Sequence, residues 1–464
     1  MSTSTTTAPP STSPAVNSRA RVIVASLIGT SIEFYDFYAY ATAAVLVFPT
    51  LFFANADPTV ALLSSFAVFG VAFIARPVGS IVFGHFGDRI GRKNTLIASL
   101  LTMGIGTFLI GCLPAATVPG WHVTAPTILV ILRFAQGFGL GGEWSGAALL
   151  ATENAPANKR AIYGTFPQLG APIGFMIANG LFLILNLTMS AAAFASWGWR
   201  IPFLGSAILV IIGLYARFRL IETPAFTAVK EAGQVSKLPL GRVFRTSWRQ
   251  VILGTFIMLA TYTLFYLMTT FTLTYGTTAS TAATAAKAAG KPFSAAAFVP
   301  GLGYTRTQFL LMLIVGVAFF GIFTLVSGPL AERFGRRKML MAVTAGILVF
   351  GFLFVPLFSA GFAGAQGLLI LGFILMGLTF GPMGAILPEL FPANVRYTGS
   401  AISYNVSSIL GAAVAPFIAV ALWGAAHGST VLVGVYLSAM ALITLVALFL
   451  SRETRDVDYS ANLS

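Results

Sequence analysis

Twelve apolar stretches of about 20 residues follow one another along the chain, and no other feature constrains the fold as strongly. A helix needs about 20 apolar residues to cross the hydrocarbon core of a bilayer. The composition agrees, because 57% of the 464 residues are hydrophobic and 9% are charged, against about 25% charged in an average soluble protein. We therefore predict an all-α integral membrane protein with spans near 22–48, 60–84, 94–114, 125–150, 161–186, 199–218, 249–276, 304–329, 339–359, 365–387, 397–423 and 430–450.

The distribution of positive charge predicts how the chain is oriented. The net charge is +14, which in a soluble protein would suggest binding to nucleic acid. On the twelve-span map, however, 21 of the 27 Lys and Arg residues fall on the side that holds both termini. Cytoplasmic loops carry an excess of Lys and Arg. We therefore predict a multi-pass protein of the plasma membrane with both termini in the cytoplasm, in contact with lipid and not with nucleic acid.

Two motifs occur twice, at matched positions, and indicate an internal duplication. Residues 84–93 after the second span and 328–337 after the eighth both read G-x-x-x-[DE]-R-x-G-R-[RK]. Residues 153–160 after the fourth span and 389–396 after the tenth both read E-x-x-P-A-N-x-R. Parallel halves of this kind are typical of secondary transporters. The predicted organisation is a disordered tail 1–18, a six-helix half 19–218, a cytoplasmic linker 219–248, a second half 249–450 and a cytoplasmic tail 451–464.

The composition also excludes several kinds of chemistry. The chain has one cysteine, Cys112, so it can form neither an intramolecular disulfide nor a cysteine metal cluster. Its three histidines lie in connections, and no P-loop motif for ATP occurs. We therefore expect no metal and no cofactor. An intramembrane enzyme would need a nucleophile and a base at membrane depth, and it is disfavoured because all three histidines lie in connections. A channel is disfavoured because a duplicated asymmetric chain lacks a symmetric filter.

Four segments carry a resemblance to a known family. They are Glu33-Phe34-Tyr35-Asp36-Phe37, residues 75–79 (ARPVG), residues 133–144 (RFAQGFGLGGEW) and residues 387–392 (LPELFP). Together with the duplicated loop motif, they resemble the metabolite/proton symporters of the major facilitator superfamily, which include carriers of shikimate, α-ketoglutarate, citrate, and proline or betaine. The resemblance covers the chain except its tails and the loop 277–303. It implies a twelve-helix transporter, not an enzyme, that works by alternating access with a proton as the coupling ion. We expect it to function as a monomer.

Charged residues at membrane depth are the first candidates for the mechanism, because a charge inside a bilayer costs several kcal/mol. Glu33 and Asp36 are three residues apart on the first span and share one face. Arg133 on the fourth span lies at a similar depth. We hypothesise that the two carboxylates face Arg133, so that substrate or a conformational change competing for Arg133 makes proton binding switchable. Arg76 and Glu143 lie nearer the cytoplasm, where a structural ion pair is an equal alternative.

The duplicated loops are candidates for the cytoplasmic gate. The resemblance implies that Asp88, Arg89 and Arg92 close the cytoplasmic side, with Glu153 as a partner. Arginine and carboxylate pairs suit this task because they bind strongly when partly desolvated and separate when the halves tilt. The corresponding residues of the second half are Glu332, Arg333, Arg336 and Glu389.

The second half has no acidic residue in the middle of its spans, and its polar residues there are neutral. They include Thr269, Thr270, Ser407 and Ser408. We predict proton chemistry in the first half and neutral recognition in the second. The predicted substrate-binding residues are Arg76, Arg133, Tyr262, Tyr266, Tyr404 and Asn405.

These features predict a proton symporter that imports a small organic acid, since Arg binds carboxylates through two parallel hydrogen bonds. The alternative is proton symport of a zwitterionic osmolyte such as proline or glycine betaine. Residues 170–174 (GAPIG) match part of a motif associated with exchangers of the superfamily, so exchange in place of symport also stays open.

Overall fold

The computed structural model describes residues 19–54, 56–90, 92–141, 143–218, 240–278, 301–392 and 395–457. Side chains are described for these residues except 19–22, 84–90, 92–96, Ala157, Leu240 and Arg242. All regular secondary structure in this part of the chain is helical. The predicted tail 1–18, most of the linker 219–248 and most of the loop 277–303 lie outside the described residues.

The first half contains six helical segments long enough to cross a membrane, and two of them are interrupted. In the fourth, α5 ends at Leu140 and α6 begins at Glu143, and the fifth is broken at Leu169. The short helices α2 (Phe48–Phe52) and α9 (Ala191–Ser196) lie in connections. The membrane segments are α1 (Arg19–Leu46), α3 (Pro58–Ile90), α4 (Arg92–Cys112), α5 (Thr124–Leu140) with α6 (Glu143–Glu153), α7 (Arg160–Gln168) with α8 (Gly170–Thr188), and α10 (Ile201–Phe218).

The second half repeats this pattern after the short helix α12 (Leu240–Thr246). Two of its segments contain a π-helical turn, Leu267–Phe271 and Ser408–Ala413. The membrane segments are α13 (Trp248–Tyr266) with the first π-helical turn, α15 (Arg306–Phe334), α16 (Arg336–Gly351) with α17 (Phe354–Ser359), α18 (Gly361–Glu389), α19 (Arg396–Ser407) with the second π-helical turn and α20 (Ala415–Ala425), and α21 (Val431–Leu450). Within the described residues, nine segments are long and apolar enough to cross a membrane, and α1, α4 and α16 complete the twelve that the sequence predicts.

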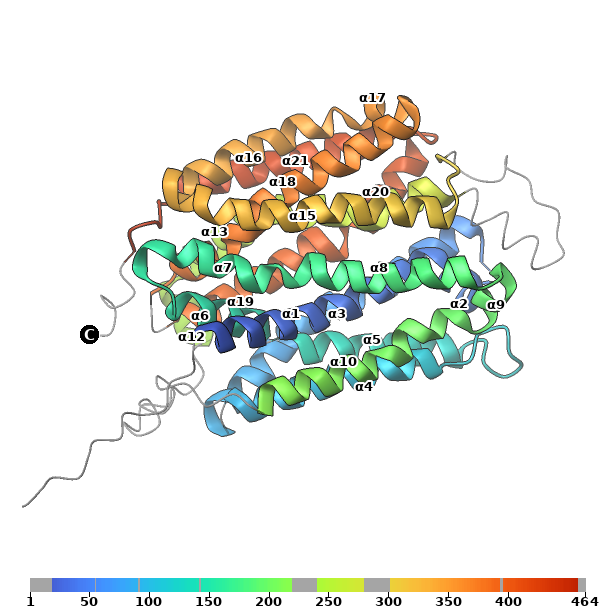
Figure 1. Ribbon diagram of the computed structural model, residues 1–464, viewed down its shortest axis with the longest axis horizontal. Helices are drawn as coiled ribbons and strands as arrows, with labels where there is room; N and C mark the ends of the chain where they lie inside the picture. The colour runs from blue at the N-terminus through green and yellow to red at the C-terminus, as the bar shows by residue number, and fades with distance from the viewer. Residues whose placement is uncertain are drawn as a thin grey trace, which may run out of the picture.

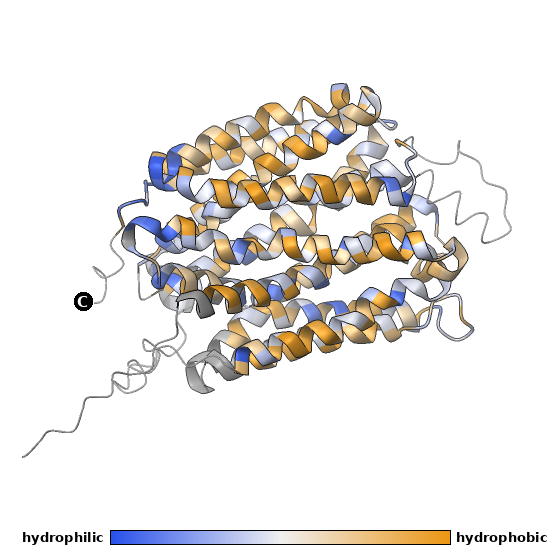
Figure 2. Ribbon diagram, in the orientation of Figure 1, coloured by the Kyte–Doolittle hydropathy of each residue, from blue (hydrophilic) through white to orange (hydrophobic). Residues whose placement is uncertain are grey.

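The two halves lie side by side with their helices roughly parallel to the long axis of the molecule (Figure 1). The start of α1 and the end of the chain lie at the same end of the bundle, as an even number of spans requires. Figure 2 shows hydrophilic residues gathered at this end and apolar residues along the length of the helices. Large apolar side chains such as Ile131, Ile208 and Phe449 are exposed on this outer surface, which suits contact with lipid.

Glycines let α3 and α5 approach closely, and this contact positions the site described below. A Cβ atom at Gly137 would overlap the backbone carbonyl of Ala72, and one at Gly141 would overlap that of Arg76. The helices can therefore pack backbone to backbone. Since Arg76 lies on α3 and Arg133 on α5, their side chains are brought into the same layer of the first half.

Candidate functional site

Six charged side chains are buried inside the first half, and each is at most 6% exposed. They come from four membrane segments: α1, α3, α5 with α6, and α10. Three are acidic and three are basic. They are Glu33, Asp36, Arg76, Arg133, Glu143 and Arg217.

Two of the three acidic residues form ion pairs. Glu33 accepts a hydrogen bond from Arg76 at 3.2 Å, and Glu143 accepts one from Arg217. In this conformation Glu33 is therefore paired with Arg76 of α3 and not with Arg133. Partner choice depends on how each helix is rotated about its axis, and depth alone does not determine it.

Asp36 and Arg133 are connected through two neutral side chains. The Thr107 hydroxyl donates to Asp36 Oδ2 at 2.9 Å, and Gln136 Nε2 donates to the Thr107 hydroxyl at 2.7 Å. Gln136 Oε1 in turn accepts a hydrogen bond from Arg133. Among the described residues, no carboxylate lies within salt-bridge distance of Arg133. The carboxylate and the guanidinium therefore interact through the relay of Thr107 and Gln136.

Aromatic rings cover both central arginines. The Arg133 guanidinium carbon lies 4.0 Å from the centroid of the Tyr40 ring and 4.5 Å from that of the Phe37 ring. The Arg76 guanidinium carbon lies 4.2 Å from the Phe37 centroid. Such contacts stabilise a cation without neutralising it. Arg133 Nε and Nη2 have no hydrogen-bond partner, and neither has Asp36 Oδ1. These groups keep donor and acceptor capacity for another ligand.

The predicted residues of the second half face this layer with aromatic rings. Tyr404 stacks on Trp144 of α6 with centroids 3.9 Å apart, and it contacts Tyr262 at 5.3 Å. Tyr266 contacts Phe73 of α3 at 5.6 Å. Asn405, the remaining predicted residue of this half, donates to the Gly141 carbonyl at 3.2 Å. In this conformation, Tyr266, Tyr404 and Asn405 therefore contact residues of the first half.

At the end of the bundle that holds the termini, a buried ion-pair cluster joins the predicted gate residues of the second half. Arg336 contacts Glu332 at 2.8 Å and Glu389 at 3.4 Å, whereas Arg333 is exposed. Glu332 also accepts a hydrogen bond from the Ala161 backbone of the first half at 2.7 Å. Glu153 is exposed at the end of α6. The side chains of Asp88, Arg89 and Arg92 lie outside the described residues.

Residues 451–457, which we name the C-terminal strap, cross this cluster. Thr454 donates to Glu389 at 2.7 Å, and Glu453 accepts hydrogen bonds from the first backbone amides of α16 at 2.9 and 3.1 Å. Arg160 of the first half donates to the Val457 carbonyl at 2.6 Å. At the opposite end of the bundle, Arg306 donates to the Leu46 carbonyl at 3.1 Å. The two halves therefore make contact at both ends.

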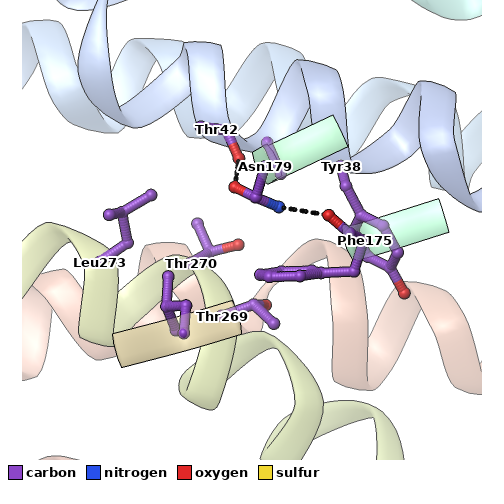
Figure 3. A pocket seen from close by; sticks show the side chains of 9 residues that line it. Tyr38, Thr42, Phe175, Asn179, Thr269, Thr270 and Leu273 are labelled. Atoms are coloured by element: carbon purple, nitrogen blue, oxygen red, sulfur yellow. Dashed lines mark hydrogen bonds between the residues drawn. The ribbon is translucent and has the colours of Figure 1, made fainter. Parts of the chain in front are cut away.

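A small cavity lies between the halves, bordered by α1, α8, α15 and the segment that follows α13 (Figure 3). Its volume is about 10 Å³, room for a single water-sized sphere. Among the described residues, the two halves thus make contact at both ends, and the cavity between them is small. The residues that line the cavity are Tyr38, Ala41, Thr42, Phe175, Asn179, Thr269, Thr270, Leu273 and Leu313.

Sequence reasoning missed several polar residues of the site. Arg217 lies in the last turn of α10, where a basic residue is an ordinary helix end, and its partner Glu143 becomes apparent only from packing. Thr107, Gln136 and Asn179 are neutral residues on apolar helices. The only available signal was a polar side chain at membrane depth, which in a bilayer is usually hydrogen-bonded.

Comparisons with known proteins agree with this architecture. The family model described as "Sugar (and other) transporter" matches residues 21–242 and 295–460. The chain belongs to this family of the major facilitator superfamily. It is 56% identical to the inner membrane metabolite transport protein YhjE of Escherichia coli K12 over 446 residues, covering 95% of this chain and 96% of that protein. It is 34% identical to the E. coli shikimate transporter, covering 94% and 96%, and 30% identical to the E. coli proline/betaine transporter, covering 94% and 84%.

Solved structures of the superfamily share the fold. The proton:xylose symporter XylE superposes with a TM-score of 0.71 at 18% identity, covering 94% of this chain and 96% of XylE. The predicted fold is therefore confirmed: this is a major facilitator with twelve membrane helices in two halves, a membrane transporter and not an enzyme.

Proposed function

We propose that the protein is a proton-coupled symporter that imports a small organic acid. The observation that carries the proposal is Arg133, which is completely buried, has two guanidinium nitrogens without partners and has no carboxylate within salt-bridge distance in the described residues. A buried cation with free donors is a suitable site for a carboxylate. Arg76 is a second candidate on the same layer, although Glu33 occupies it in this conformation.

Proton coupling follows from competition within this layer. While no substrate is bound, the Thr107 and Gln136 relay connects the charge of Asp36 to Arg133. A substrate carboxylate that binds Arg133 leaves Asp36 next to a neutralised cation, which favours its protonated form. Glu33 is the second proposed proton acceptor. A substrate that draws Arg76 away would leave Glu33 without its cationic partner, which favours the protonated form of Glu33. Substrate and proton therefore enter together.

Several further expectations belong to the proposal. We place the protein in the cytoplasmic membrane with both termini inside, supported by the distribution of Lys and Arg and by the inner-membrane name of its relative YhjE. The proposed cytoplasmic gate consists of the cluster around Arg336 together with the duplicated loop at Asp88, Arg89 and Arg92. We propose that the monomer is the functional unit, that no cofactor is used and that the proton is the coupling ion.

The second candidate is symport of a zwitterion such as proline or glycine betaine. Aromatic rings near the carboxylates favour it, because Tyr38 stacks on Phe34 at 5.8 Å and contacts Phe265 at 5.4 Å, and such rings attract quaternary ammonium groups. Related proline/betaine transporters are also consistent with it. In this case Arg133 binds the carboxylate of the zwitterion and the rings bind its cationic end.

Uptake into proteoliposomes tests both candidates. Labelled shikimate, 2-oxoglutarate, proline and glycine betaine are supplied outside, with an imposed pH gradient that is acidic outside or with none. We expect saturable uptake of an acid that collapses when an ionophore removes the pH gradient. Asp36→Asn and Glu33→Gln should each abolish the dependence on the gradient. Proton-driven uptake that survives in the double variant would contradict the coupling mechanism, and uptake of betaine alone would select the second candidate.

A further inference from the structure

We propose that Thr270, Asn179 and Thr42 form a neutral subsite that binds a hydroxyl group of the substrate. The proposal rests on the proposed function and refines its substrate class to a monocarboxylate that also bears hydroxyl groups. All three residues line the cavity between the halves, with Thr42 on α1 and Asn179 on α8 of the first half and Thr270 in the π-helical turn of the second. Figure 3 shows Asn179 and Thr42 on one wall and Thr270 on the facing wall.

Thr270 differs from neighbouring threonines of the same membrane segment. The threonine hydroxyls near it donate to the backbone carbonyl four residues earlier, as those of Thr269 at 2.8 Å and Thr272 at 2.6 Å do. Thr274 and Thr277 follow the same pattern. The Thr270 hydroxyl has no hydrogen-bond partner although the residue is 2% exposed. A buried hydroxyl without a partner is destabilising, so this one is available to a ligand.

The backbone around this hydroxyl is irregular. Thr270 lies in the π-helical turn Leu267–Phe271, where the regular α-helical ladder is interrupted. Such turns occur frequently at functional sites. Thr269 belongs to the same turn and also lines the cavity, but its hydroxyl donates to the Phe265 carbonyl, so Thr270 is the one of the two that keeps its hydroxyl for a ligand.

The opposite wall offers a preorganised polar pair. Thr42 donates to Asn179 Oδ1 at 2.7 Å, and Asn179 Nδ2 donates to the Phe175 carbonyl at 3.2 Å. Each of these groups keeps further capacity, since a carboxamide has two donors and two acceptor positions and a hydroxyl has two lone pairs. No charged residue lines the cavity. The subsite therefore suits a neutral group that both donates and accepts, which describes a hydroxyl and excludes a carboxylate or an ammonium group.

The size of the cavity and its place along α1 limit the substrate. About 10 Å³ accommodates one hydroxyl-sized group and no more. Phe37, which contacts Arg76, precedes Thr42 by five residues, an axial rise of about 7–8 Å with a rotation of about 140° around α1. In the proposed binding mode, the carboxylate of a small ring acid or short-chain acid lies near the arginines and a hydroxyl lies at Thr270. Since Thr270 and Asn179 belong to different halves, the hydroxyl also links the halves as they close.

Matched variants and matched probes test the subsite. The probes are cyclohexanecarboxylate, trans-4-hydroxycyclohexanecarboxylate, shikimate and the neutral polyol myo-inositol, and their binding to purified protein is measured by calorimetry and by thermal shift. In the wild-type protein, we expect trans-4-hydroxycyclohexanecarboxylate or shikimate, whichever binds more tightly, to bind at least about fivefold more tightly than cyclohexanecarboxylate. This is the effect of one hydrogen bond. Thr270→Val should remove this preference and leave the affinity for cyclohexanecarboxylate unchanged.

Thr272→Val is the control, because Thr272 is also fully buried on this segment but does not line the cavity. It should keep the preference. Thr270→Val should melt no lower than the wild type, since its hydroxyl has no hydrogen bond to lose. A preference that survives Thr270→Val, or that Thr272→Val removes equally, would overturn the subsite. If only myo-inositol binds and its binding requires Thr270, the subsite holds and the organic-acid function fails. If no probe binds the wild-type protein, both are overturned.

Discussion

The two halves share a fold but differ in the chemistry of their interiors. The first half buries three carboxylates and three arginines. In the described spans of the second half, the charged side chains lie at the ends of the helices, and the middle presents tyrosines, threonines and an asparagine. Duplication therefore preserved the helix arrangement while charge was concentrated in one copy. Because the charges of the first half compensate one another locally, the neutral half can tilt against them without carrying an unpaired charge through the membrane.

Replacing Arg133 should give the largest effect, because it removes the buried cation of the first half that we propose binds the substrate carboxylate. Arg133→Gln should lower uptake of the acid by about 1000-fold, the loss of two charged hydrogen bonds of about 2 kcal/mol each. Initial rates in proteoliposomes measure this. The variant should melt close to the wild type, since no salt bridge within the described residues is lost. Uptake within threefold of the wild type would remove Arg133 from the binding site.

The second prediction concerns the compensation of charge within the first half. Glu143→Gln leaves Arg217 buried without its carboxylate, and we expect unfolding to become about 3–5 kcal/mol easier. The double variant Glu143→Gln with Arg217→Met should recover most of this loss, because no uncompensated charge remains. Thermal unfolding in detergent gives the comparison. Equal stability of the single and double variants would show that the pair contributes no local compensation.

A third experiment interrupts the relay without changing any charge. Thr107→Val removes the hydrogen bonds to Asp36 and Gln136, and we expect about tenfold slower uptake driven by a pH gradient. Substrate exchange at equal pH should be much less affected, because it requires no net proton transfer. Thr107→Ser keeps the hydroxyl and should restore the rate. A valine variant that matches the serine variant would place the coupling elsewhere.

The smallest effect is expected in the neutral half. Tyr404→Phe keeps the ring that stacks on Trp144, so uptake should stay within about threefold of the wild type. Tyr404→Leu removes the stacking, worth about 0.5–1.5 kcal/mol, and should lower uptake several-fold. A Phe variant as impaired as Arg133→Gln would show that the second half contributes more than packing and neutral recognition, and would break the comparison between the halves.

The sequence predicts the fold well because the bilayer imposes one rule on every span. Apolar runs of sufficient length locate the twelve membrane segments, and the repeated loop motifs reveal the duplication. It does not predict the interruption at Leu169 or the π-helical turns, since these depend on packing against other helices. Thr270 appears as one threonine among many in its segment.

Partners within the charged layer are equally hard to predict. Depth placed Glu33, Asp36 and Arg133 in one layer, but helix rotation paired Glu33 with Arg76. Asp36 and Arg133 are connected through two neutral residues, Thr107 on α4 and Gln136 on α5. Charge alone does not reveal such intermediates, because they are recognised only by the hydrogen bonds they make.

The C-terminal strap has a consequence for the biogenesis of the protein. It is translated after every membrane segment, yet it provides hydrogen bonds to Glu389, to the start of α16 and to Arg160 of the first half. A ribosome-bound chain that has inserted all its helices therefore still lacks these contacts, although the Ala161 backbone can already bind Glu332 across the halves. The full set of contacts between the halves at this end forms only when the strap leaves the ribosomal tunnel.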